Sequence, residues 1–205
     1  TEAVRQATLF QFFFSSLILA FAIIHLLLFI FYPKAKENLF YSISMIGFAI
    51  VIYAGPQVNF AESFADIVLI NAINTLSVQA AILFGLLTIY ANTYSKMPGQ
   101  YIGFVLISTL FATQTIFFPQ FDRNLNYFFY AYAVIITMEM IRVVIASIKN
   151  KNSWSWGWVI GAGFICAMLI IAYQVLILTG VIEQPLFGVR YVYVYGIVFL
   201  ALTVS

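Results

Sequence analysis

Charged residues are scarce in this chain. Nine of its 205 residues are Lys or Arg and seven are Asp or Glu, which gives a charged fraction of 8% and a net charge of +2. Soluble domains are about 25% charged and about 45–50% apolar, whereas this chain is 64% hydrophobic. The composition therefore excludes a water-soluble domain and a disordered segment. The small net charge also excludes the basic surface that nucleic-acid binding requires.

Cysteine and histidine are nearly absent as well. Cys166 is the single cysteine and His25 the single histidine. An internal disulfide, a multi-cysteine metal site and any motif with two histidines are thereby excluded. No GxSxG motif and no Gly-rich phosphate loop occurs, and every lysine lies outside the apolar runs, so that a retinal-type Schiff base has no candidate. We expect this segment to have no cofactor, no metal and no catalytic activity.

Long apolar runs, each bounded by polar or helix-breaking residues, are what the sequence contains instead. About 20 apolar residues in a helix cross a hydrocarbon core of roughly 30 Å. The runs are continuous and lack the alternation of barrel strands, so helices are the structure that satisfies the backbone in lipid. We predict an all-α membrane protein, a seven-transmembrane helix bundle that forms one domain over residues 1–205. Its predicted spans are about 8–32, 39–55, 63–93, 99–118, 127–148, 154–179 and 187–205.

The basic residues beside these spans predict the orientation. Cytoplasmic flanks of membrane helices are enriched in Lys and Arg. With the N-terminus outside and the C-terminus in the cytoplasm, six basic residues fall on the inner side and three on the outer side. The inner set is Lys34, Lys36, Lys96, Arg142, Lys149 and Lys151, and the outer set is Arg5, Arg123 and Arg190.

Both ends of the chain look cut. It opens at Thr1 without an initiator Met, and the stretch from Arg190 to Ser205 covers only about 24 Å as a helix. We expect the chain to be the membrane region of a longer, multidomain protein.

Ionisable side chains within predicted spans form an inner polar layer. The layer contains His25, Glu139 and Arg142. His25 and Glu139 lie at similar depth, and Glu139 and Arg142 are three residues apart and can pair on one helix face. Such groups are costly in a membrane and need a partner or a purpose. One hypothesis is an ionic cluster that switches when helices shift. The alternative is a satisfied structural pair with a snorkelling arginine and a hydrogen-bonded histidine.

Amide side chains form an outer polar layer. It contains Asn71, Asn74, Gln114 and Gln174. They are candidates for a pocket that opens to the outside, or for hydrogen bonds between helices. Two pairs of glycines spaced by four, Gly99 with Gly103 and Gly157 with Gly161, predict close packing, either within the bundle or in a dimer.

The first predicted hairpin carries a family resemblance. The stretch from Ala22 to Phe29 reads AIIHLLLF, a short basic turn follows, and LFYSI opens the second span at Leu39. This pattern resembles the bacterial seven-transmembrane receptors with diverse intracellular signalling modules (7TMR-DISM). The resemblance implies an extracellular N-terminal sensor domain, a C-terminal cytoplasmic effector domain and a place in the bacterial inner membrane.

The leading hypothesis is accordingly a receptor core that relays an extracellular signal to a cytoplasmic effector. Its expected partners are membrane lipids, the two flanking domains and a second copy in a homodimer. A small transporter or channel that joins the two polar layers is the alternative, and a passive membrane anchor is a third.

Overall fold

The computed structural model describes residues 2–118 and 123–149, together with positions 162, 163, 165, 166, 169, 170, 173, 176 and 196–198. Within this part of the chain every regular element is helical. The elements are α1 (Glu2–Phe31), α2 (Lys36–Gln57), the 3₁₀ turn η1 (Val58–Phe60), α3 (Phe64–Thr93), α4 (Gln100–Phe117) and α5 (Arg123–Lys149). The predicted spans 154–179 and 187–205 lie almost entirely outside the described residues.

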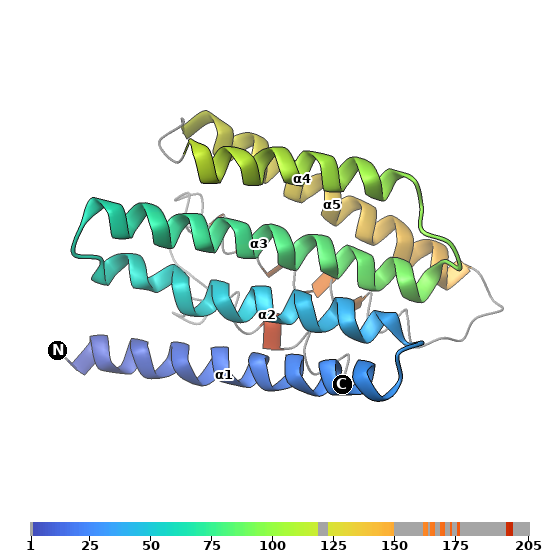
Figure 1. Cartoon of the computed structure of the whole chain (residues 1–205), viewed down its shortest axis with the longest axis horizontal. Helices are drawn as coiled ribbons and strands as arrows, with labels where there is room; N and C mark the ends of the chain where they lie inside the picture. Colours follow the sequence, from blue (N-terminus) through green and yellow to red (C-terminus); the bar gives the residue numbers. More distant parts are fainter. Residues whose placement is uncertain are drawn as a thin grey trace.

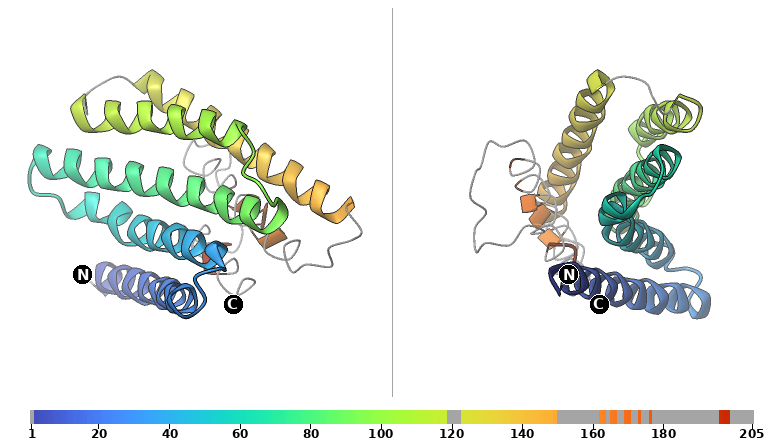
Figure 2. Two further views of the ribbon diagram at one scale, coloured as in Figure 1. Left: turned by 45° about the vertical axis from the view of Figure 1, so that its right-hand side comes forward. Right: turned by 90° about the vertical axis from the view of Figure 1, so that its left-hand side faces the viewer.

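Helices α1 to α4 form a row of neighbours that alternate in direction, and α5 lies to one side of this row near α3 (Figures 1 and 2). Lysines mark one end of the bundle, where α1, α3 and α5 end. We call it the lysine end; it carries Lys34, Lys36, Lys96 and Lys149. The opposite end carries Glu62 and Asp66 between α2 and α3, and we call it the acidic end.

Four of the described helices are long and apolar enough to cross a membrane. They are the Thr8–Phe31 part of α1, and α2, α3 and α4. Large apolar side chains remain exposed along them, for example Phe13 and Leu110. Because exposed apolar surface of this extent is stable in lipid and not in water, the chain is an all-α integral membrane protein.

Three helix boundaries differ from the prediction for physical reasons. Helices α1 and α5 begin at Glu2 and Arg123, before the predicted starts at 8 and 127. Hydropathy marks the part of a helix that lies in lipid, and a helix continues beyond it into the aqueous boundary. Helix α2 also continues through Pro56 to Gln57, since membrane helices tolerate a proline that packs against neighbours.

Helix α2 packs most closely against α3, and Gly47 is the reason. A methyl group added at Gly47 would lie 2.8 Å from the backbone oxygen of Ser77 and 3.0 Å from Ala81 Cβ. Serine hydroxyls of α2 reach both neighbouring helices: Ser44 Oγ donates to Ala81 O of α3 at 2.8 Å, and Ser42 Oγ donates to Ala22 O of α1 at 2.8 Å. Small residues thus allow backbones to approach and hydroxyls to cross between helices.

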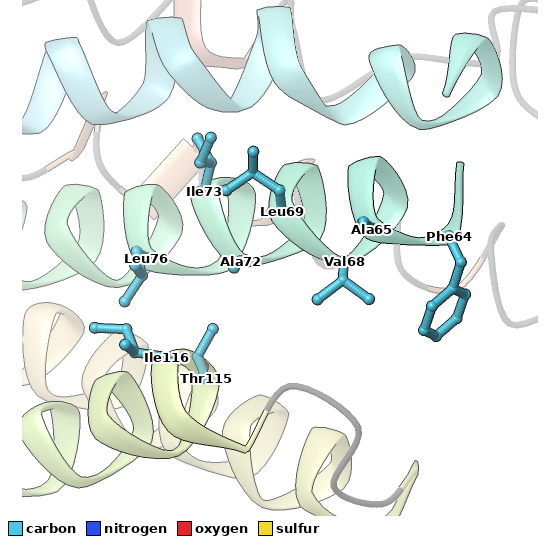
Figure 3. A pocket seen from close by; sticks show the side chains of 9 residues that line it. All are labelled: Phe64, Ala65, Val68, Leu69, Ala72, Ile73, Leu76, Thr115 and Ile116. Atoms are coloured by element: carbon cyan, nitrogen blue, oxygen red, sulfur yellow. The ribbon is translucent and has the colours of Figure 1, made fainter. Parts of the chain in front are cut away.

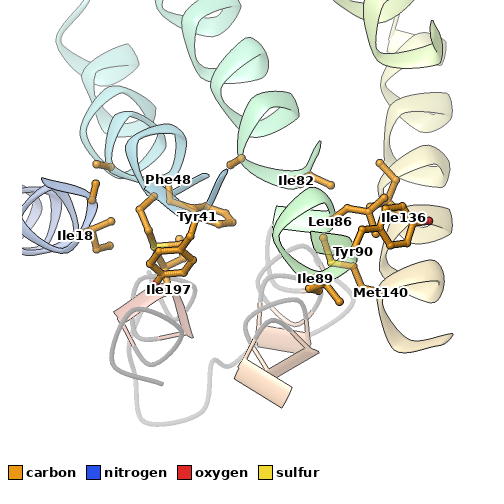
Figure 4. Close-up of a cluster of buried hydrophobic side chains, with 14 of the residues drawn as sticks. Ile18, Tyr41, Phe48, Ile82, Leu86, Ile89, Tyr90, Ile136, Met140 and Ile197 are labelled. Carbon is orange, nitrogen blue, oxygen red and sulfur yellow. The ribbon is translucent and has the colours of Figure 1, made fainter. Parts of the chain in front are cut away.

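The apolar core continues from this contact toward α5 (Figure 4). Leu86 and Tyr90 of α3 lie beside Ile136 and Met140 of α5 in Figure 4, and all four are at most 1% exposed. Tyr90 therefore reaches α5 through a packed interface, which positions its hydroxyl for the polar group described next.

Candidate functional site: a carboxylate shared by three helices

Glu139 of α5 is the centre of a polar cluster near the lysine end. Its side chain is 11% exposed and pairs with Arg142 through two contacts of 2.7 Å, one on each carboxylate oxygen. Oε1 also accepts a hydrogen bond of 2.5 Å from the Tyr90 hydroxyl of α3 and one from Gln100 Nε2 of α4. One carboxylate thus joins α3, α4 and α5. We call Tyr90, Gln100, Glu139 and Arg142 the Glu139 cluster.

Tyr90 is held on all sides. Besides donating to Glu139, its hydroxyl oxygen accepts a hydrogen bond of 2.9 Å from Gln100 Nε2. Tyr94 and Tyr101 pack edge-on against its ring, with centroids 5.8 and 6.0 Å away. Such aromatic pairs add specific geometry to simple burial. The Tyr90 hydroxyl is therefore fixed at the point where α3, α4 and α5 meet.

The chemistry of the cluster is that of a joint between helices. Hydrogen bonds to a charged group contribute about 1.5–3 kcal/mol each, and a buried charge that loses its partners is strongly unfavourable. A shift of α5 away from α3 breaks the hydrogen bond from Tyr90, and a shift away from α4 breaks the one from Gln100. The ion pair with Arg142 lies within α5 and is retained. Such a movement leaves the charged carboxylate with fewer hydrogen bonds, at a cost in free energy.

His25 belongs to a different group. Its Nδ1 lies 2.9 Å from Asn38 Oδ1 of α2, and its ring packs edge-on against Tyr41 with centroids 4.4 Å apart. The ring is 4% exposed, and among the described residues Nε2 has no hydrogen-bond partner. The predicted inner layer thus divides in two: the predicted ion pair Glu139–Arg142 is present, whereas His25 joins α1 to α2.

The predicted outer layer is not assembled into a polar pocket by the described residues. Asn71 is exposed, and Asn74 and Gln114 are half-buried. Asn74 Oδ1 is a buried atom without a partner in the described part of the chain. A groove of about 500 Å³ does open at this height between α3 and α4, but apolar residues line it and none of these amides does (Figure 3). Gln174 lies outside the described residues.

Of the two predicted glycine contacts, the one at Gly99 and Gly103 differs from the expectation of packing within the bundle. Around Gly99 and Gly103 an added methyl group would meet no atom within 4 Å, so the described structure does not use them for packing within the bundle. The alternative of a dimer contact stays a prediction. Gly157 and Gly161 lie outside the described residues.

Three participants in the polar groups were not singled out from the sequence. Tyr90 fits an interfacial aromatic, and Asn38 and Gln100 fit loop-end polar residues. Their roles come from partners 13 to 49 positions away along the chain. The one available signal is that each lies within a turn or two of a span end at the same side of the membrane as Glu139 and His25.

Metal binding receives no support from the described side chains, among which no group of three His, Cys, Asp or Glu residues lies close together. The Glu139 carboxylate is already occupied by Tyr90, Gln100 and Arg142. The arrangement is suited to holding helices in register.

These features define a class of protein: an α-helical membrane bundle in which a carboxylate, ion-paired within its own helix, accepts hydrogen bonds from two neighbouring helices. The family model described as 7TM diverse intracellular signalling matches residues 7–205. The chain belongs to this family, which confirms the resemblance noted in the first hairpin and identifies the chain as a membrane signalling-receptor domain. No curated protein and no solved structure gives a significant match.

Proposed function

We propose that this domain relays an extracellular signal through a shift of its helices to a cytoplasmic effector domain that follows the seventh span. A ligand shifts such an equilibrium only by its different affinity for two arrangements. The bundle therefore needs two packings that are close in free energy. The segment itself performs no catalysis in this proposal.

The Glu139 cluster is the observation that carries the proposal. It places a nearly buried carboxylate where α3, α4 and α5 meet. In this proposal, a charged carboxylate that accepts hydrogen bonds from two neighbouring helices supplies the discrete arrangements that a relay needs. The three other side chains of the cluster hold the carboxylate in the described arrangement, and their release defines the second one.

The proposed topology has seven spans, an N-terminus outside and a C-terminus in the cytoplasm of a bacterial inner membrane. The lysine end faces the cytoplasm, in agreement with the bias of basic residues to that side. The described helices place Lys34, Lys36, Lys96 and Lys149 at one end, and Glu62 and Asp66 at the other. We also propose a homodimer, because effector domains of signalling proteins commonly act in pairs.

The test uses the full-length receptor in native membranes and measures the basal activity of its effector. Glu139→Gln removes the charge but keeps the shape, and we expect it to change the ratio of active to inactive receptor about tenfold, because one charge-assisted contact is worth about 1.4 kcal/mol or more. Glu37→Gln, the same chemical change in the first turn of α2 at the lysine end, is the matched control and should leave the ratio unchanged.

Three results oppose the proposal. Equal effector activity of the Glu139→Gln and Glu37→Gln variants would show that the Glu139 cluster has no part in the relay. In a second experiment, all spans are replaced by an unrelated membrane anchor. If the protein still responds to its stimulus, the domain is a passive anchor. Robust ion or solute flux into liposomes that contain this domain alone would favour the transporter alternative.

A further inference from the structure

A groove between α3 and α4 is a hollow of the molecule that no part of the relay uses. Val68 and Leu76 point from α3 toward α4, and Thr115 and Ile116 of α4 face them (Figure 3). Its volume of about 500 Å³ is within the range of small-molecule sites, about 300–1,000 Å³. The groove is thus large enough for a ligand.

The lining selects an apolar occupant. Eight of the nine lining residues are apolar, and the ninth, Thr115, donates its hydroxyl to the backbone oxygen of Phe111 at 2.9 Å. No lining side chain is charged. A polar ligand would lose its hydration here without gaining hydrogen bonds from the walls.

The groove also has the length and the position of one lipid chain. Its α3 wall runs from Phe64 at the acidic end to Leu76, which is about 18 Å of helix. One leaflet contributes about half of a hydrocarbon core of roughly 30 Å. The groove therefore runs from the acidic end to about the middle of the membrane.

A second hollow beside the first gives the occupant its polar end. It has a volume of about 290 Å³, shares Leu69 with the groove, and is lined by four apolar residues together with Gln57, Glu62 and Asp66. In the N-cap of α3, Asp66 Oδ2 accepts hydrogen bonds from Ser63 N and Ser63 Oγ, and the Asp66 backbone N–H donates to Ser63 Oγ. Glu62 is exposed. Two carboxylates at the end of an apolar groove complement a positively charged headgroup.

We propose that the groove binds one acyl chain of a membrane phospholipid whose headgroup carries a primary ammonium, with the ammonium beside Glu62 and Asp66. Phosphatidylethanolamine has this chemistry. The site is independent of the proposed relay, since it uses neither the Glu139 cluster nor His25, and it stands if the relay fails.

The experiment uses the protein in vesicles of phosphatidylethanolamine and phosphatidylglycerol that contain a trace of phosphatidylethanolamine with a photoactivatable acyl chain. After illumination, mass spectrometry maps the labelled peptides. We expect labelling to concentrate on the α3 wall between Phe64 and Leu76 and on the last turn of α4. Uniform labelling of all exposed helix faces would mean ordinary surrounding lipid and would overturn the proposal.

Two variants test the two ends of the site. Ala72→Phe fills the groove and should reduce labelling there about tenfold, whereas Ala20→Phe, the same change on the exposed face of α1, should not. Glu62→Gln leaves the groove open and should reduce labelling about threefold, as for loss of one exposed ion pair. Elution as a single species with unchanged helix content shows that each variant is folded.

A labelled phosphatidylcholine or phosphatidylglycerol that marks the groove as strongly as phosphatidylethanolamine would overturn the headgroup assignment. If Ala72→Phe leaves the labelling unchanged, the groove is not the binding site of the lipid chain. If crosslinked dimers form at the groove in place of lipid adducts, its occupant is a second copy of the chain. The proposal is supported if Ala72→Phe and Glu62→Gln reduce labelling of the groove and Ala20→Phe leaves that labelling unchanged.

Discussion

Two contacts of α3 are built in opposite ways. Toward α2 the helix approaches so closely that Gly47 has no room for a methyl group, and the hydroxyl of Ser44 crosses to its backbone. Toward α4 it leaves a groove of about 500 Å³ at the acidic end, and the two helices meet at Tyr90 and Gln100 near the lysine end. The first contact depends on close backbone packing and the second on a polar cluster.

This difference teaches how a membrane bundle can combine a rigid part with a movable one. Lipid chains are as apolar as the side chains they replace, so close packing and interhelical hydrogen bonds hold membrane helices together. Many small contacts between α2 and α3 must all be lost together when these helices separate. The Glu139 cluster adds two strong hydrogen bonds that join α3 and α4 to α5, and a shift of helices can exchange them. They stand beside the apolar core and a hydrogen bond of 2.7 Å from the Tyr132 hydroxyl of α5 to Phe104 O of α4.

The largest expected effect is at the close contact. Gly47→Leu inserts a side chain where even a methyl group would lie 2.8 Å from Ser77 O, and we expect a loss of about 3 kcal/mol in the free energy of unfolding. Gly103→Leu on the open face of α4 should change it by less than about 0.5 kcal/mol. Unfolding in mixed micelles by SDS measures both, and equal losses would contradict the comparison.

A smaller effect on the free energy of unfolding is expected when the Glu139 cluster loses one hydrogen-bond donor. Tyr90→Phe leaves the Glu139 carboxylate with one hydrogen bond fewer, and we expect unfolding to become easier by about 1–2 kcal/mol. Tyr53→Phe is the matched control because Tyr53 is 42% exposed. The same unfolding titration applies, and no difference between the two variants would show that the hydroxyl contributes nothing to the joint.

Removing one serine hydroxyl should weaken the close contact only slightly. For Ser44→Ala we expect a loss of about 0.6 kcal/mol, the average for an interhelical hydrogen bond in a membrane protein. The Thr109 hydroxyl bonds to Val105 O within its own helix, so Thr109→Ala is the comparison and should cost less. A larger loss of unfolding free energy in Thr109→Ala than in Ser44→Ala would contradict the stabilising role assigned to the hydrogen bond between α2 and α3.

The smallest effect has the opposite sign. Gly103→Ala adds a methyl group in open space and reduces the conformational freedom of the unfolded chain, so we expect a gain of about 0.5 kcal/mol. Gly47→Ala should destabilise the protein in the same measurement. If Gly103→Ala destabilises it and also reduces dimer formation in crosslinking, the glycine face of α4 serves a second copy.

The locations of the helices could be predicted from the sequence, because they depend on the local succession of apolar and polar residues. Predicted spans such as 63–93 agree with α3, where Ser63 and Asp66 form the capping box that begins the helix. The pair Glu139–Arg142 followed from helical spacing. Starts at Glu2 and Arg123 were missed because hydropathy reports the lipid-facing part of a helix only.

The candidate site was predicted less completely because its contacts lie between helices. Glu139 and Arg142 were found, but Tyr90 is 49 positions from Glu139 and Gln100 is 39. Similar depth suggested that His25 would join them, whereas its partners Asn38 and Tyr41 lie on α2. Depth along a helix can be read from sequence, and the direction that a helix face takes within the bundle cannot.

The sequence by itself determined that this protein lies in a membrane and is made of helices, since apolar length and missing charge decide both without reference to any distant residue. The tertiary structure decided which polar side chains meet, where backbones touch and where a groove remains. Those outcomes depend on the rotation and spacing of neighbouring helices, which arise from packing between residues far apart in the chain.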